Sequence, residues 1–189
     1  MKATPLSVGR RVFLHTAVAW TALSRRVFGS EPAQRAVEPW SGAVVQVDEG
    51  EFLVSGRRRA PMRIKIDSRA AAGATMSMLM SEVSPGANIP VHLHRNEDEL
   101  IFIHTGEGVV TLGDRKTAVK PGAVLYAPRN VWHGIDNTGS TTVTWCAIYS
   151  PPGFEQYFRE AAIPADGAGP GPAEIAKLAE KYGMVFRTP

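Results

Sequence analysis

The sequence predicts an all-β domain, a sandwich or a barrel, followed by a short helical extension at the C-terminal end. After residue 36 the chain breaks into many short segments rich in Val, Ile, Thr and aromatic residues, a composition that favours strands. Gly, Pro, Asn and Asp separate these segments, and 18 Gly and 14 Pro among 189 residues supply many turns. No stretch alternates strands with long helices, which argues against a doubly wound α/β fold.

The expected strands are the β-rich segments between these turns. In chain order they span residues 44–47, 51–54, 62–66, 74–83, 89–93, 100–105, 108–112, 116–119, 123–127, 132–136 and 141–149. The Gly-containing segments 106–108 and 112–115 predict hairpin turns. Within 74–83, three methionines share one face of the strand, and we expect them in the core or a pocket wall: Met76, Met78 and Met80.

Helical patterns occur only near the C-terminal end. Residues 153–161 predict a short amphipathic helix with aromatic residues on one side, at Phe154, Tyr157 and Phe158. Residues 172–182 predict a second helix, because Pro172 stands at its start and apolar residues recur at helical spacing. Gly183 follows as a stop signal.

The composition excludes several classes of protein. Cys146 is the only cysteine, which rules out an intrachain disulfide and a Cys-based zinc or iron–sulfur site. No apolar run reaches the roughly 20 residues of a membrane-spanning helix. Residues 1–36 hold six of the 21 Lys and Arg residues but one of the 18 acids. The rest of the chain is therefore slightly acidic, and we expect no nucleic-acid partner.

The basic N-terminal segment predicts an export signal. Arg10 and Arg11 precede a short apolar stretch that ends at Leu23, the order found in secretory signals. The arginine pair resembles a twin-arginine signal, which implies export of the folded protein to the periplasm. The alternative is an amphipathic helix that packs on the domain. We expect a signal at 1–36, a β domain at 37–150 and a helical extension at 151–189.

Four candidate metal ligands lie in the middle of the chain. His92 and His94 are two residues apart, so a strand would direct both imidazoles to one face. Glu99 follows after a turn or bulge, and His133 lies in a later expected strand. Three imidazoles and a carboxylate suit a first-row divalent ion and leave positions open for water, dioxygen or a substrate oxygen. His104 lies an odd number of residues from Glu99, so we expect it to face away.

The spacing of these residues resembles the two cupin motifs. The first motif is fitted at every fixed position, by Gly86, His92, His94, Glu99 and Gly106. The second is fitted by Gly122, Pro128, His133 and Asn137, with Asn130 where the family usually has Gly. Asn tolerates the left-handed conformation that Gly would supply. The resemblance implies a cupin, that is, a jelly-roll-type β-barrel.

By this resemblance, one divalent transition metal is held by His92, His94, Glu99 and His133. Iron, manganese, nickel, cobalt and copper all remain open, and some cupins have lost the metal. Glu97 and Asp98 are alternative ligands, and Asp98 has the three-residue spacing that some cupins use. Only Glu99 keeps the six-residue interval to Gly106.

The ligand order and the segments 151–159 and 176–184 resemble quercetinase-like cupins. This implies a metal-dependent dioxygenase that acts on a flavonol-like or other small aromatic substrate, with Glu99 as a catalytic proton acceptor. Two other functions stay open: a ligand- or metal-binding protein without turnover, and a cupin isomerase or decarboxylase. The resemblance alone also implies a homodimer.

Overall fold

The computed structural model of the protein describes residues 42–56, 59–164 and 167–188. These ranges contain eleven strands and two helices, all within a unit that spans residues 37–189. The expected export signal, residues 1–36, lies outside the described residues. Within the described part of the chain, no helix has the length and apolar content needed to cross a membrane.

Six strands form the first antiparallel sheet: β1 (Glu51–Val54), β2 (Pro61–Ile66), β3 (Ser77–Val83), β5 (Asp98–Thr105), β8 (Val124–Ala127) and β10 (Val143–Ser150). Their order across the sheet is β1-β2-β3-β10-β5-β8. Burial alternates along β3 and β8. In β3, for example, Ser77, Leu79, Ser81 and Val83 are buried and the residues between them are half-buried. One face of this sheet therefore points into the core.

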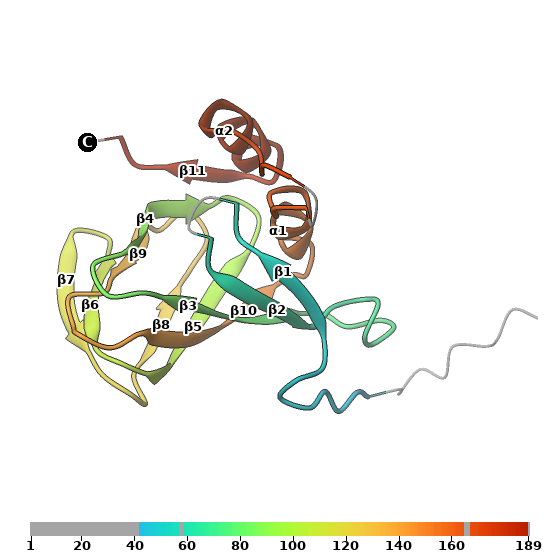
Figure 1. Cartoon of the computed structure of the whole chain (residues 1–189), viewed down its shortest axis with the longest axis horizontal. Coiled ribbons are helices and arrows are strands. Elements are labelled where there is room, and N and C mark those ends of the chain that lie inside the picture. Colours follow the sequence, from blue (N-terminus) through green and yellow to red (C-terminus); the bar gives the residue numbers. More distant parts are fainter. Residues whose placement is uncertain (1–41, 57–58, 165–166, 189) are drawn as a thin grey trace, which may run out of the picture. The chain divides into compact units, whose positions relative to one another are not determined.

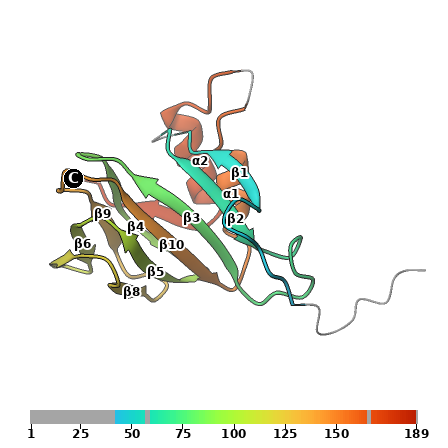
Figure 2. The same cartoon turned by 60° about the horizontal axis from the view of Figure 1, so that its bottom comes forward.

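Five strands form the second antiparallel sheet: β4 (Asn88–His94), β6 (Gly108–Leu112), β7 (Arg115–Val119), β9 (His133–Asp136) and β11 (Met184–Phe186). Their order is β11-β4-β9-β6-β7. The two sheets form the layers of a jelly roll (Figures 1 and 2). The predicted all-β, jelly-roll-type fold is thus confirmed, although the two sheets stay separate and do not close into a continuous barrel.

The hydrophobic core draws on both sheets. Met62, Leu79, Ile101 and Trp145 come from the first sheet and Ile135 from the second, and none of them is more than 2% exposed. Complete burial of a large apolar side chain contributes about 1.5–3 kcal/mol, so this interior holds the two layers together.

The C-terminal extension adds two helices and a strand to one end of the jelly roll. The helices are α1 (Glu155–Glu160) and α2 (Pro172–Lys181), and both were expected. Gly183 has a φ of 73°, a left-handed conformation that ends α2 where the sequence predicts. β11 was not predicted. It pairs with β4, whereas the residues just after α1 contact the segment that follows β1 (Figure 1).

Two local predictions are wrong. Residues 44–47 form no strand: Val44 and Val47 are 86% and 84% exposed, and no strand among the described residues pairs with this segment. Segment 106–108 is not a hairpin turn, since it carries the chain from β5 in one sheet to β6 in the other. The turn in 112–115 does form a hairpin, between β6 and β7.

Of the three methionines expected in the core or a pocket wall, Met80 lines a pocket beside β1 and β2, and none lies in the core. Met76 precedes β3 and is 46% exposed. Met78 and Met80 lie on the half-buried face of β3, because Ser77, Leu79 and Ser81 occupy the face that points inward. A stripe of one residue type on a strand therefore did not indicate which face is buried.

Candidate metal centre

Four buried side chains meet between the two sheets. His92, His94, Glu99 and His133 each offer one ligand atom, and these atoms all lie within 4.8 Å of one another. None of the four residues is more than 6% exposed. The structure therefore brings together the four residues that the sequence singles out.

Strand pairing places these groups. His92 in β4 is directly opposite His133 in β9. The two strands approach closely at Gly134, where a Cβ atom would lie 2.8 Å from the carbonyl oxygen of Ile89 and 3.1 Å from the Cα of Val91. Glu99 comes from β5 in the other sheet, so its carboxylate joins the histidines from across the interior.

Backbone carbonyls orient two of the imidazoles. The Nδ1–H of His92 donates to the carbonyl oxygen of Pro90 at 2.8 Å, and that of His133 donates to the carbonyl oxygen of Val131 at 2.9 Å. A carbonyl oxygen can only accept, so Nδ1 carries the proton in both rings. The Nε2 atoms of His92 and His133 therefore face the interior of the site and are free of the Nδ1 proton.

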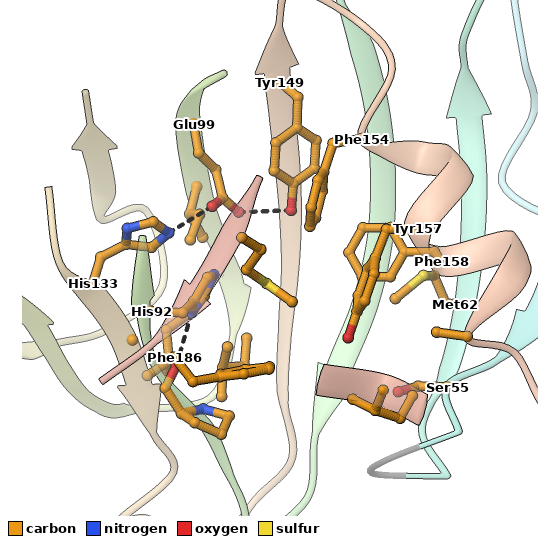
Figure 3. Close-up of a pocket in the computed structure, with 18 of the residues that line it drawn as sticks. Ser55, Met62, His92, Glu99, His133, Tyr149, Phe154, Tyr157, Phe158 and Phe186 are labelled. Carbon is orange, nitrogen blue, oxygen red and sulfur yellow. Dashed lines mark hydrogen bonds and ion pairs between the residues drawn. The ribbon is translucent and has the colours of Figure 1, made fainter. Parts of the chain in front are cut away.

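The Glu99 carboxylate is the centre of the cluster. Its Oε2 lies 2.7 Å from His133 Nε2 and 3.1 Å from His94 Nε2. Its Oε1 accepts a hydrogen bond from the Tyr149 hydroxyl at 2.8 Å (Figure 3). Sequence reasoning missed Tyr149, although it is the cross-strand neighbour of Glu99 on β10. Predicting this contact requires the register between β5 and β10.

The buried charges shift the acidities of these groups. Burial raises the pKa of Glu99, but its hydrogen bonds with His133 and His94 outweigh burial and bring the pKa well below its ordinary value. Burial lowers the pKa of His133, yet the contact with Glu99 raises it overall. His92 has its pKa lowered to about 3, first by burial and then by the neighbouring imidazoles. The cluster thus provides an ionised carboxylate and a neutral imidazole, both of which can coordinate a cation.

Comparison with known proteins identifies the fold that carries this site. Residues 79–149 match the family described as Cupin domain, and this stretch contains all four clustered residues. This stretch therefore resembles a cupin domain. The left-handed φ of 66° at Asn130 explains how Asn replaces the usual Gly of the second cupin motif.

Curated relatives match over part of their length. The oxalate-binding protein of Thermotoga maritima is 31% identical over 67 residues, covering 35% of this chain and 55% of the relative. YrkC of Bacillus subtilis, an uncharacterized protein, is 25% identical over 107 residues, covering 53% of this chain and 58% of the relative. The uncharacterized MJ1618 of Methanocaldococcus jannaschii is 31% identical over 80 residues, covering 42% of this chain and 64% of the relative. The chain thus spans about 55–64% of the length of these relatives.

Solved structures agree on the cupin fold. KdgF from Halomonas sp. superposes with a TM-score of 0.54 at 17% identity, covering 61% of this chain and 99% of that one. A predicted oxalate decarboxylase from Thermotoga maritima gives a TM-score of 0.51 at 24% identity, covering 58% and 99%. At these identities the likeness concerns the fold alone.

The two acidic neighbours of Glu99 lie outside the four-residue cluster. Asp98 pairs with Arg129, whose Nε and backbone N–H both lie 3.0 Å from Asp98 Oδ1. Glu97 is buried with its Oε2 3.9 Å from His94 Nδ1, and burial raises the pKa of Glu97 to about 7. Neither belongs to the four-residue cluster, so the alternative ligands are not supported. His104 is exposed on β5, as its spacing predicts.

The four clustered residues fit a divalent transition-metal ion. His94 Nδ1 is buried without a hydrogen-bond partner, and His94 Nε2 has only the Glu99 carboxylate beside it, at 3.1 Å, although buried polar groups in proteins are almost always paired. Three imidazoles and one carboxylate are the donor types that iron, manganese, nickel, cobalt and copper accept. A bound ion would be coordinated by the Nε2 atoms and would balance the buried carboxylate.

An apolar pocket with a cavity volume of about 70 Å³ opens beside the cluster. His92, Glu99 and His133 line one end, and the other walls include aromatic side chains from α1, β10 and β11 (Figure 3). These aromatic residues are Trp145, Tyr149, Phe154, Tyr157, Phe158 and Phe186. Phe154 also packs edge-on against His94, with 4.2 Å between ring centroids. The C-terminal extension is therefore part of the site.

Proposed function

We propose that the protein is a metal-dependent oxidoreductase, a dioxygenase that acts on a small, largely apolar organic substrate. One observation carries this proposal: a buried cluster of three histidines and a glutamate opens into a pocket walled by aromatic side chains. Such a pocket favours a ligand that buries a planar or aliphatic body and presents one oxygen atom to the cluster. Enols and catechols have this chemistry.

The protein's own residues have separate roles in this proposal. A divalent ion, when bound, would polarise the substrate oxygen. Glu99 accepts the proton that an enol or catechol hydroxyl loses on binding, and the Tyr149 hydroxyl holds the Glu99 carboxylate in place through Oε1. The aromatic wall excludes water from the reacting carbon.

Oxalate is the second candidate ligand, because one curated relative is named an oxalate-binding protein. Oxalate is a small dianion that protein sites commonly pair with Arg or Lys. Among the described residues that line the pocket, none is Lys or Arg. The apolar walls therefore favour a neutral substrate over the oxalate dianion.

The test is an oxygen-uptake assay on protein purified without oxygen and reloaded with iron, manganese, nickel, cobalt or copper in turn. Each form is offered a panel of flavonols, catechols and 1,3-diketones, with oxalate as the competing ligand. Metal-dependent oxygen uptake with one of the aromatic or diketone substrates supports the proposal. Binding without turnover would indicate a binding protein, and turnover without oxygen uptake would indicate an isomerase or a decarboxylase.

The proposal includes export to the periplasm through the twin-arginine signal at residues 1–36. A protein exported in the folded state can acquire its metal in the cytoplasm, where metal availability differs from that outside. Changing Arg10 and Arg11 together to Lys should retain the protein in the cytoplasm of its host. Cell fractionation measures this, and unchanged periplasmic recovery of the variant would contradict the signal.

A further inference from the structure

The three histidines of the cluster are held in two different ways. His92 and His133 each donate Nδ1–H to the carbonyl oxygen of the residue two positions earlier. His94 has no such bond, and its Nδ1 is buried without a hydrogen-bond partner. One imidazole of the cluster therefore has no backbone group that selects its tautomer.

Glu97 faces the nitrogen that His94 leaves unpaired. Its Oε2 lies 3.9 Å from His94 Nδ1, and this oxygen is also buried without a partner. A carboxylate accepts hydrogen bonds and an imidazole Nδ1–H donates them, so the two unsatisfied atoms are complementary. A small rotation of the Glu97 side chain would close the gap between them.

The backbone around Glu97 is fixed on both sides. The N–H of Arg95 donates to the carbonyl oxygen of Gly183 at 2.9 Å, and the N–H of Asn130 donates to the carbonyl oxygen of His94 at 2.6 Å. Asp98 is held by Arg129. These bonds tie the turn between β4 and β5 to β11 and to the loop before β9, which keeps Glu97 behind His94.

We infer that Glu97 is a positioning residue for the metal site: its carboxylate accepts the Nδ1–H of His94 and so assigns the Nε2 of that ring to the ion. This inference rests on the proposed metal binding. A carboxylate is a stronger acceptor than a backbone carbonyl, so it also makes the imidazole a better electron donor. His94 is then the histidine whose donor strength depends on a side chain.

The test compares Glu97→Gln with the wild type and with Asp98→Asn. Both variants remove one negative charge from the same turn, but only Glu97 faces His94. Zinc affinity, measured by competition with a coloured chelator, should fall by about 10- to 100-fold in Glu97→Gln, as expected for loss of such a ligand-orienting contact. Asp98→Asn should stay within about threefold of the wild type, because the Asn side-chain oxygen can still accept the backbone N–H of Arg129 and the lost exposed ion pair contributes little.

Nitrogen-15 NMR of the zinc-loaded proteins provides the second measurement. The Nδ1–H proton of His94 should resonate far downfield in the wild type and move upfield in Glu97→Gln, whereas the signals of His92 and His133 stay in place. A general loss of stability would move all three. Glu97→Ala should show the same pattern more strongly, and Glu97→Gln keeps the test usable if the Ala variant does not fold.

Three outcomes would overturn the inference. Unchanged zinc affinity and an unchanged His94 signal in Glu97→Gln would refute the role of Glu97 while leaving the metal site standing. An equal loss of affinity in Asp98→Asn would assign the effect to the charge of the turn. Failure of the wild type itself to bind zinc, cobalt or any other first-row divalent ion would refute the proposed metal site, and the inference with it.

Discussion

Replacing Arg159 with Met tests what holds the aromatic wall of the pocket in place. Arg159 lies in α1, and its Nε donates to Glu51 Oε2 in β1 at 2.7 Å. Its guanidinium also pairs with Asp67, which follows β2. The side chains of Arg159 and Asp67 are 10% and 3% exposed, so the pair is buried. Met preserves the length of the side chain but leaves the Asp67 carboxylate without its cation.

The expected loss of stability follows from this burial. Removing one partner of a buried ion pair costs about 3–5 kcal/mol. Asp67 keeps two hydrogen bonds, from the backbone N–H groups of Arg69 and Ala70, both at 2.9 Å, so we expect the lower end, about 3 kcal/mol. At about 2–4 °C per kcal/mol for a domain of this size, the Tm should fall by about 6–12 °C.

The loss of stability in Arg159→Met should shrink as the pH falls. Burial raises the pKa of Asp67, but its hydrogen bonds with Arg159, Ala70 and Arg69 outweigh burial and lower it below the ordinary value. A carboxyl whose pKa is lower in the folded state stabilises the fold above its unfolded pKa, and that contribution is lost as the pH falls through the folded pKa. The difference between wild type and variant should be constant above about pH 5 and shrink below about pH 4.

Urea unfolding followed by circular dichroism measures the free-energy difference. Lys181→Met is the matched control, because it breaks the exposed ion pair between Lys181 and Glu160 and should leave the Tm nearly unchanged. Adding Asp67→Asn to Arg159→Met should restore part of the loss, since no buried charge then lacks a partner. A loss below about 1 kcal/mol in Arg159→Met, or an equal loss in the control, would refute the reasoning.

Three further predictions concern the metal, the segment 46–49 and the thiol. His133→Ala should lose bound metal, measured by elemental analysis, while keeping the wild-type circular dichroism spectrum. The control variant His104→Ala changes an exposed histidine and should keep its metal. Full metal content in His133→Ala would contradict the ligand assignment. Lys65 is buried, and its Nζ donates to the carbonyl oxygens of three residues within 46–49. Lys65→Met should therefore lower the free energy of unfolding by about 1.5–3 kcal/mol. It should also speed amide hydrogen exchange in residues 46–49. Burial raises the pKa of Cys146 to about 11, so the native protein should resist a disulfide reagent at about pH 8 and react once per chain after denaturation; rapid reaction of the native form would contradict this burial.

The pattern of the sequence predicted most strands because burial on one face imposes a two-residue period. It also singled out the four residues of the cluster, because His92 and His94 are two positions apart and the motif spacing selects Glu99 and His133. Metal binding itself stays a prediction. The strand prediction failed at residues 44–47, where no described strand pairs with the segment. The prediction of the buried face failed on β3, because both faces of that strand carry apolar residues.

The sequence pattern does not predict the register between paired strands. Nothing in the spacing of Glu99 and Tyr149, 50 positions apart, shows that they are cross-strand neighbours. The same holds for Glu97 behind His94, where the spacing suggested a competing ligand and the structure shows a buried carboxylate that faces the ring. β11 was missed because its three residues carry no period and form a strand only against β4.

The sequence by itself determined the all-β fold, the helices near its C-terminal end and the identity of the four clustered residues, because hydrophobic period, turn chemistry and motif spacing are local properties of the chain. The tertiary structure alone decided which groups orient those residues and which side chains form the pocket. Those contacts join segments far apart in the chain, and their distances depend on how the two sheets and the C-terminal extension pack against one another.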